Sequence, residues 1–221
     1  LKIKSHHKIL EIGCGWGGFA EYAAKNIGCE IKGITISPSQ LEFAKSRIKN
    51  QGLDNKVTLE LCDYRDLKGK FDRVVSIEMI EAVGEKYWID YFKKIKEVLS
   101  KGGMAGIQVI LINNKSYERY SKSVDFIQRY VFPGGMLPSQ ERLNENYKKS
   151  GLKEIQSSSF GKSYAKTLGI WHEDFANSIK SIRDLGFDSK LERIFRYYFS
   201  YCKAGFNSEK IDVVQKIIKS A

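Results

Sequence analysis

Apolar runs of strand length alternate with helical segments from the start of this 221-residue chain, and this alternation constrains the fold more than any other feature. It predicts a parallel β-sheet with helices on both faces. The expected strands are Lys8–Ile12, Glu30–Ile36, Val57–Cys62, Arg73–Ile77 and Met104–Ile110. Between them, apolar residues recur at helical spacing in Phe19–Asn26, Ser39–Asn50 and Tyr87–Leu99.

The alternation is interrupted after the fifth strand by a polar, tyrosine-rich stretch, Asn113–Tyr130. We interpret it as a loop excursion at the carboxyl ends of the strands, where open α/β sheets bind ligands. Beyond it we expect a helix (Ser139–Ser150), a strand (Lys153–Ser159) and two aromatic helices (about Ser163–Leu185 and Ser189–Ala204). The final run, Ile211–Ile218, fits the period of a strand and that of a helix. The length and the 42% hydrophobic content favour a single domain.

The composition limits the partners and the compartment. Four scattered cysteines lack the spacing of a disulfide framework or a metal site, so we predict no metal. A formal charge of +11 favours polyanionic partners, without separating nucleic acid from an anionic membrane surface. No apolar run approaches the roughly 20 residues of a membrane-spanning helix, and no targeting segment opens the chain. We therefore expect a cytoplasmic protein, and a start at Leu1 rather than Met suggests a fragment.

The segment Glu11-Ile12-Gly13-Cys14-Gly15-Trp16-Gly17 follows the first expected strand and opens a helix. Glycine at such a turn permits positive φ and lets the backbone approach a ligand closely. The dinucleotide fingerprint places its third glycine one position after Gly17, and it has an acidic residue at the end of the second strand. No acid stands at that strand end here, and Glu11 precedes the glycines instead.

The run Glu11–Gly15 resembles the first motif of the Rossmann-like methyltransferases, whose glycine turn borders the methionine part of S-adenosylmethionine. The run Thr35-Ile36-Ser37-Pro38-Ser39-Gln40 is similar to the Thr-x-Ser-x-x-Gln variant of the cyclopropane and mycolic acid synthases. Asp63-Tyr64-Arg65 is similar to the adenine-binding turn of that family, in which Asp63 would accept from the exocyclic amine. The resemblance implies cofactor contacts from Glu11, Gly13, Cys14, Gly15, Trp16, Gly17, Thr35, Ile36, Gln40, Asp63, Tyr64 and Arg65.

Further runs resemble cyclopropane synthase signatures in the order of that family: Ser76–Gly84, Asp125–Gly135, Leu137–Ser139, Phe160–Tyr164 and Tyr197–Phe206. The resemblance implies an α/β Rossmann-like methyltransferase fold, with a seven-stranded, mostly parallel sheet, helices on both faces and an insertion after strand five. It also implies a lid or substrate insertion at about 113–138, a helical insertion at about 163–206, and an antiparallel last strand over Ile211–Ile218.

The activity implied by the resemblance is transfer of a methylene group from S-adenosylmethionine to the cis double bond of an unsaturated phospholipid acyl chain. The alkene attacks the methyl group to give a carbocation, and loss of a proton from that methyl closes a cyclopropane ring. A base and a dry channel are therefore required. In the family the base is thought to be a bound bicarbonate, and the resemblance assigns its binding to Glu81, Gln108, the Ile110 amide and Tyr164.

Two positions depart from the family pattern. Gln108 stands where the family commonly has histidine, and an amide donates a hydrogen bond but cannot carry a proton. By the resemblance, a cysteine of the family's set belongs to a segment before Leu1 and is absent from the sequence given, so we leave open whether the chain as it stands is active.

Other interpretations stay open. Glu81 could cap a helix, Tyr164 could be a core aromatic residue and Gln108 an ordinary strand residue. The same framework could methylate a small-molecule amine, or it could bind the cofactor without catalysing a reaction. We expect peripheral association with a phospholipid membrane and no nucleic-acid partner, because no RNA-binding module is recognisable. A homodimer is also left open.

Overall fold

The computed structural model describes all 221 residues, Leu1 to Ala221. The chain divides into two compact units. Unit 1 consists of Leu1–Val109, Asn144–Ser157 and Gln215–Ala221, and unit 2 consists of Ile110–Leu143 and Ser158–Val214. The two insertions expected at about 113–138 and 163–206 both fall within unit 2. None of the helices combines the length and the apolar composition needed to cross a membrane.

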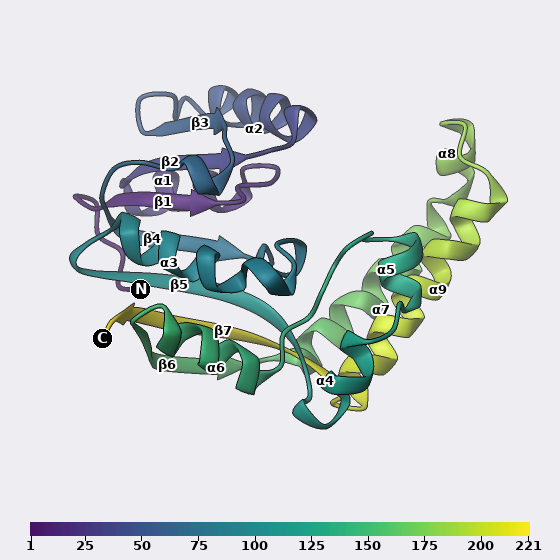
Figure 1. Cartoon of the computed structure of the whole chain (residues 1–221). Helices are drawn as coiled ribbons and strands as arrows, with labels where there is room; N and C mark the ends of the chain where they lie inside the picture. The colour runs from purple at the N-terminus through teal and green to yellow at the C-terminus, as the bar shows by residue number, and fades with distance from the viewer. The chain divides into compact units, whose positions relative to one another are not determined.

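A seven-stranded sheet runs in the order β3-β2-β1-β4-β5-β7-β6 (Figure 1). Its strands are β1 (Lys8–Ile12), β2 (Glu30–Thr35), β3 (Val57–Leu61), β4 (Phe71–Ile77), β5 (Leu99–Ile112), β6 (Leu152–Ser159) and β7 (Ile211–Ser220). The first five strands pair in parallel, and Figure 1 shows β7 running against them. The expected fold class is confirmed, and the run that periodicity left ambiguous is a strand.

The strand order reverses at β1, and this reversal positions the candidate site. β1 pairs with β2 on one side and with β4 on the other, so the chain crosses over β1 after β3. Open α/β sheets bind ligands beyond the carboxyl ends of the strands at such a reversal. The loops after β1, β2, β3 and β4 therefore belong to the edge where a ligand is expected.

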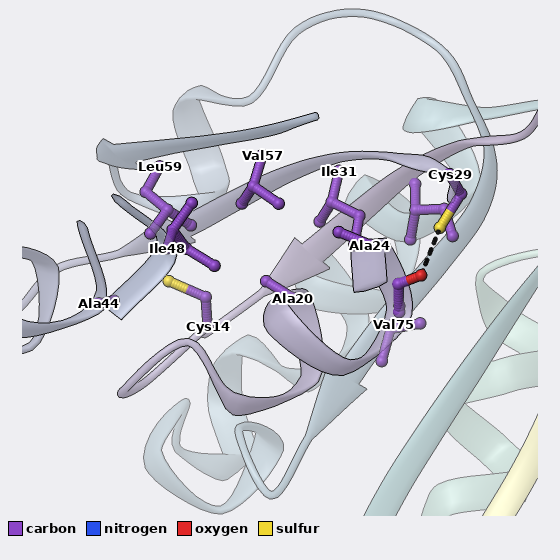
Figure 2. Close-up of a cluster of buried hydrophobic side chains, with 12 residues drawn as sticks. Cys14, Ala20, Ala24, Cys29, Ile31, Ala44, Ile48, Val57, Leu59 and Val75 are labelled. Carbon is purple, nitrogen blue, oxygen red and sulfur yellow. Dashed lines mark hydrogen bonds between the residues drawn. The ribbon is translucent and has the colours of Figure 1, made fainter. Parts of the chain in front are cut away.

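Three helices connect these strands: α1 (Gly18–Ile27), α2 (Pro38–Asn50) and α3 (Trp88–Val98). Ser37 caps α2 by accepting from the Gln40 N–H at 3.3 Å, and Pro38 takes the first helical position, where no N–H is needed. Small side chains on α1, such as Ala20 and Ala24, pack with Ile31 of β2 and Ile48 of α2 in one buried cluster (Figure 2). This packing holds α1 and α2 against the sheet and so fixes where the first turn of each helix lies.

The interpretation of Asn113–Tyr130 as a loop is wrong, because the stretch contains the helices α4 (Asn114–Ser121) and α5 (Phe126–Tyr130). Asn113 caps α4 by accepting from the Ser116 N–H at 2.9 Å. Asp125 and Gln128 form a reciprocal capping box at the start of α5. These caps satisfy N–H groups that a short helix leaves without intrahelical partners. The polar composition that suggested a loop in fact includes the capping residues.

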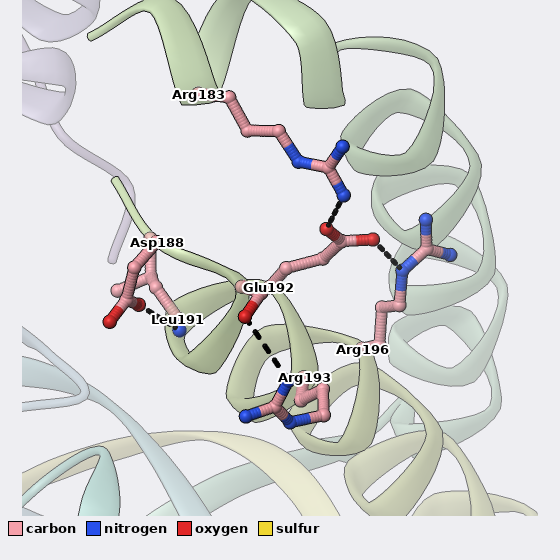
Figure 3. A network of polar contacts seen from close by, with 7 residues as sticks. Arg183, Asp188, Leu191, Glu192, Arg193 and Arg196 are labelled. Carbon is pink, nitrogen blue, oxygen red and sulfur yellow. Dashed lines mark hydrogen bonds and ion pairs between the residues drawn. The ribbon is translucent and has the colours of Figure 1, made fainter. Parts of the chain in front are cut away.

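The first expected aromatic helix is divided into α7 (Gly161–Asn177) and α8 (Ile179–Asp184), and α9 (Ser189–Asn207) follows. The helix expected at Ser139–Ser150 is α6 (Gln140–Lys149). Buried side chains of α7 and α9, among them Leu168 and Phe199, form the core of unit 2. Glu192 on α9 accepts from Arg183 at 2.6 Å and from Arg196 at 3.0 Å, and so ties α8 to α9 (Figure 3).

Candidate functional site

The turn between β1 and α1 adopts left-handed backbone conformations, with φ of 79° at Gly13, 50° at Gly15 and 79° at Gly17. It is anchored to β2, because the Gly13 and Cys14 N–H groups donate to the Ile34 carbonyl at 3.0 and 2.8 Å. A Cβ on Gly17 would lie 3.0 Å from the Ala44 Cβ, whereas a Cβ on Gly15 would meet nothing within 4 Å. The turn is therefore closed against α2 at Gly17 and open beside Gly15.

Cys14 belongs to the core rather than to an open surface. Its side chain is buried in the cluster with Ala20 and Ile48 (Figure 2), and burial raises the pKa of its thiol to about 11. Its N–H donates to Ile34, and its carbonyl accepts from the Gly17 N–H at 2.9 Å. The Cys14 thiol is therefore not placed to react, and the predicted contact of Cys14 with the cofactor, through its backbone, stays a prediction.

Glu11 places a buried carboxyl group directly before the turn. Its side chain is 3% exposed, one oxygen is bonded by the backbone N–H of Ala20, and Oε2 has no hydrogen-bond partner. Burial raises the pKa of Glu11 to about 8, although the Ala20 N–H lowers it. A positive charge near this strand end would favour the ionised carboxylate. The residue fits a cationic ligand such as S-adenosylmethionine.

Thr35 and Gln40 are joined across the start of α2. The Thr35 hydroxyl donates to Gln40 Oε1 at 3.1 Å and accepts from the Ser37 N–H at 3.1 Å. Because Thr35 holds the carbonyl oxygen, the NH2 group of Gln40 is directed away from Thr35 and can donate to another acceptor. The hydroxyl oxygens of a ribose are acceptors of this kind. The local geometry of the Thr-x-Ser-x-x-Gln run therefore suits the expected cofactor.

Asp63 caps the short 3₁₀ helix Tyr64–Asp66 that follows β3. Its Oδ1 accepts from the Arg65 N–H and Nε, both at 2.9 Å, and its Oδ2 accepts from Arg65 Nη2 at 2.6 Å. These bonds hold the pKa of Asp63 below its usual range. The Cys62 N–H donates to the Thr35 carbonyl at 3.0 Å, which brings this turn beside the end of β2. Both carboxylate oxygens of Asp63 thus accept from Arg65, and lone pairs remain for a further donor. The contact of Asp63 with adenine stays a prediction.

Large apolar side chains are exposed around these turns. Ile36 is 74% exposed directly after β2, and Trp16, Leu61 and Ile77 are also exposed, at or after the ends of β1, β3 and β4. Trp16 packs edge-on against Phe43 at 5.2 Å between ring centroids. Trp16 and Ile36 are among the cofactor contacts expected from the sequence. Leu61 and Ile77 are not, because only their position at the end of a strand distinguishes them from other apolar residues. Apolar side chains at this edge suit a flat aromatic ligand such as adenine.

The four residues expected to hold an anion are distributed over both units. Glu81 lies in the 3₁₀ helix Ile80–Ala82 and Gln108 on β5, both in unit 1. Ile110 and Tyr164 pack against the core cluster of unit 2. Their assembly into one anion pocket therefore stays a prediction. Near Glu81, burial raises the pKa of Tyr91 above its usual range, and the charge of Glu81 adds to this shift.

Gln108 has partners that the sequence did not reveal. Its Nε2 donates to Glu78 Oε1 at 2.8 Å, and its Oε1 accepts from Gln215 Nε2 at 3.0 Å. Glu78 adopts a φ of 51°, which is unusual for a residue with a side chain. No local sequence pattern signals this backbone conformation or the pairing of β4 with β5 that brings the two residues together.

A family model described as mycolic acid cyclopropane synthetase matches residues 1–216. The chain is 38% identical over 214 residues to tuberculostearic acid methyltransferase UfaA1 of Mycobacterium tuberculosis, covering 96% of this chain and 50% of that protein. It is 35% identical over 218 residues to cyclopropane-fatty-acyl-phospholipid synthase of Escherichia coli, covering 98% of this chain and 54% of that protein. The chain thus spans about half the length of these curated relatives.

A solved structure of mycolic acid cyclopropane synthase CmaA1, complexed with SAH and CTAB, superposes with a TM-score of 0.91. The superposition covers 99% of this chain and 79% of that chain, at 23% sequence identity. At this identity the similarity shows the fold, and the family is shown by the family model and the curated relatives.

Proposed function

Since the chain belongs to the mycolic acid cyclopropane synthetase family of S-adenosylmethionine-dependent methyltransferases, we propose that it transfers a methylene group to the cis double bond of unsaturated phospholipid acyl chains. The observation that carries the cofactor part of this proposal is the open glycine turn beside Gly15, next to the buried carboxyl group of Glu11. The lipid part rests on the similarity to a protein named cyclopropane-fatty-acyl-phospholipid synthase.

In this proposal the residues of unit 1 are divided among the three parts of S-adenosylmethionine. The turn at Gly13–Gly17 and Glu11 would border the methionine part, with Glu11 opposite positive charge. Gln40, held by Thr35, would donate to the ribose hydroxyl oxygens. The exposed side chains of Ile36 and Leu61 would cover the adenine ring, beside the turn at Asp63.

Bound S-adenosylmethionine would supply an electrophilic methyl group. After the alkene has taken up this group, a base must remove one of its protons, and water must be kept away from the cation. We assign the binding of a bicarbonate base to Glu81, Gln108, the Ile110 amide and Tyr164. Glu81 would accept a hydrogen bond from the bicarbonate O–H, while the amide groups of Gln108 and Ile110 and the hydroxyl of Tyr164 donate to the other bicarbonate oxygens, one of which takes the proton.

We place the lipid substrate in a membrane to which the protein binds peripherally. The chain carries a formal charge of +11, and each basic residue near an anionic surface contributes on the order of 1 kcal/mol. In unit 2 the turn between α8 and α9 exposes Leu185 (77%) and Phe187 (50%), with exposed Asp184 and Asp188 beside them and exposed Lys180 and Lys190 further along the two helices. Exposed apolar side chains of this kind suit insertion at the headgroup region, while the attraction to anionic lipid comes from the net charge of the chain.

The cofactor site is tested by calorimetry of S-adenosylhomocysteine binding to Gly15→Val and to a matched control, Gly52→Val. Both glycines have positive φ, 50° and 65°, and open space where a Cβ would lie. Each substitution should cost stability by about 1–2 kcal/mol, because a side chain is strained in this conformation. Gly52 lies in the turn after α2. Only Gly15→Val should weaken binding, and equal binding by both variants would show that the site is misplaced.

The reaction is tested by mass spectrometry of lipids from cells that express the protein as its gene encodes it. We expect monounsaturated acyl chains to gain one CH2 group. Ozonolysis then distinguishes the products, because a cyclopropane ring resists cleavage whereas a methylene branch retains a cleavable double bond. Unchanged acyl chains together with methylation of an added amine would favour an amine methyltransferase instead.

Membrane association is tested by flotation with vesicles of neutral and of anionic phospholipid. Binding should require the anionic lipid and weaken as salt increases. The double substitution Leu185→Ser and Phe187→Ser should weaken it further at constant net charge. Flotation that is indifferent to lipid charge and to salt would contradict the proposed peripheral binding.

A further inference from the structure

Glu78 directly follows β4 and holds Gln108 of the neighbouring strand in two ways. Its N–H donates to the Gln108 carbonyl at 2.9 Å, and its Oε1 accepts from Gln108 Nε2 at 2.8 Å. In β5 the residue paired with Ile77, immediately before Glu78, is Gln108. One acidic residue thus fixes both the backbone and the side chain of the same partner.

The left-handed conformation of Glu78 is part of this arrangement. Its φ of 51° lies in a region that glycine enters without strain and other residues enter rarely. A glycine at this position would satisfy the backbone, but it would supply no carboxylate to Gln108. The presence of a glutamate in this conformation, where glycine would be relaxed, points to a use for its carboxylate.

The carboxylate of Glu78 determines which way the amide of Gln108 faces. An ionised carboxylate accepts hydrogen bonds and cannot donate them, so the amide nitrogen must face Glu78. The amide oxygen then faces Gln215, which donates to it from Nε2 at 3.0 Å. A flipped amide would place the Gln108 oxygen against the carboxylate. Without these two partners the terminal torsion of a glutamine is broad.

We propose that Glu78 is a positioning residue, which fixes the amide plane of Gln108 and thereby the direction of that amide's second N–H bond. The inference rests on the proposed function, in which Gln108 donates a hydrogen bond to the bicarbonate base. Glu78 acts through Gln108 and does not itself take part in proton transfer. Gln215 supports the same orientation from β7.

Two substitutions at this position separate positioning from a merely structural role. Glu78→Gly removes the carboxylate and also the backbone strain, so the variant should melt at a temperature at least as high as that of the parent protein. Its turnover should nevertheless fall by about ten-fold or more, because small misplacements of a catalytic group are costly. Glu78→Gln bonds to either orientation of the Gln108 amide, so its turnover should lie between those of the parent and Glu78→Gly.

The orientation is measured without any activity assay, from the side-chain amide signals of ¹⁵N-labelled glutamine. The Gln108 signals are assigned by their loss in Gln108→Met. They should shift and exchange faster with solvent in Glu78→Gly. The side chain of Gln128 donates to the Gly135 carbonyl at 2.8 Å and serves as the reference that should not change.

Three results would overturn the proposal. These are parental turnover in Glu78→Gly, unchanged Gln108 amide signals in that variant, and a loss of S-adenosylhomocysteine affinity that parallels the loss of turnover. The last result would show that Glu78 serves the cofactor site instead. If the parent protein does not modify lipid acyl chains, the proposed function fails, and the amide signals still decide whether Glu78 holds Gln108.

Discussion

Replacing Glu11 with glutamine should flatten the pH dependence of folding stability. The buried carboxyl group of Glu11 has its pKa raised from 4.5 to about 8, chiefly by burial. The folded chain therefore binds this proton more tightly than the unfolded chain does. Its contribution to stability is fully present below pH 4.5 and is lost as the pH rises toward 8. Glutamine keeps the shape of the neutral acid and has no proton to lose.

The magnitude follows from the difference between the two pKa values. A value of about 8 exceeds 4.5 by about 3.5, which corresponds to about 5 kcal/mol at about 1.4 kcal/mol per pH unit. Relaxation and water entry reduce such penalties in real proteins. We therefore expect the free energy of unfolding of the parent protein to fall by about half of this value, roughly 2–3 kcal/mol, between pH 5 and pH 9.

The assay is urea denaturation at pH 5, 7 and 9, with Glu42→Gln as the matched control. Glu42 is an exposed glutamate on α2, so its substitution changes the net charge equally without touching a buried group. The parent protein and Glu42→Gln should lose stability with rising pH by about 2–3 kcal/mol more than Glu11→Gln does. Parallel profiles for Glu11→Gln and Glu42→Gln would refute the assignment of a buried neutral Glu11.

Four further outcomes are expected. S-adenosylmethionine should bind more tightly as the pH rises from about 6 to 9, because the cationic cofactor favours ionised Glu11; in calorimetry Glu11→Gln should lose this dependence. Glu154→Gln should destabilise the protein by about 2 kcal/mol in denaturant, because Lys216 is buried and pairs with Glu154 at 2.8 Å. Glu60→Gln, which breaks the exposed pair with Lys32, should cost less than about 1 kcal/mol. Glu81→Gln should cut turnover severely while cofactor affinity stays within a few-fold, and parallel losses of both would contradict its role in the transition state.

The sheet was predictable because its strands are short apolar runs that turns interrupt. β1 has the expected bounds, and β2 and β3 each end one residue early. β5 begins at Leu99 rather than Met104, because the expected strand was taken to start after Gly102 and Gly103. A pattern of apolar residues does not show how far a strand continues through glycines. The expected element is therefore a strand, as observed, and only its first residue is wrong.

The parts of the site that escaped prediction depend on contacts between separate strands. Thr35 and Gln40 are five residues apart, so a motif can encode their contact. Glu78 and Gln108 are thirty residues apart, and their contact depends on the register of β4 and β5 together with a left-handed backbone at Glu78. Neither the strand register nor this backbone conformation produces a pattern in the local sequence. Cys14 shows the reverse case, because it lies inside a cofactor motif while its thiol packs in the core.

The partners of Gln108 bear on its proposed role at an anion, at a position where the family resemblance implies a histidine. A neutral histidine donates from one ring nitrogen, and the hydrogen bond at its other nitrogen determines which one. A glutamine amide presents both a donor and an acceptor, and rotation by half a turn exchanges them. An amide beside an anion is useful only if this rotation is prevented. Glu78 Oε1 accepts from the amide nitrogen and Gln215 Nε2 donates to the amide oxygen, so the role proposed for Gln108 depends on three residues rather than on Gln108 alone.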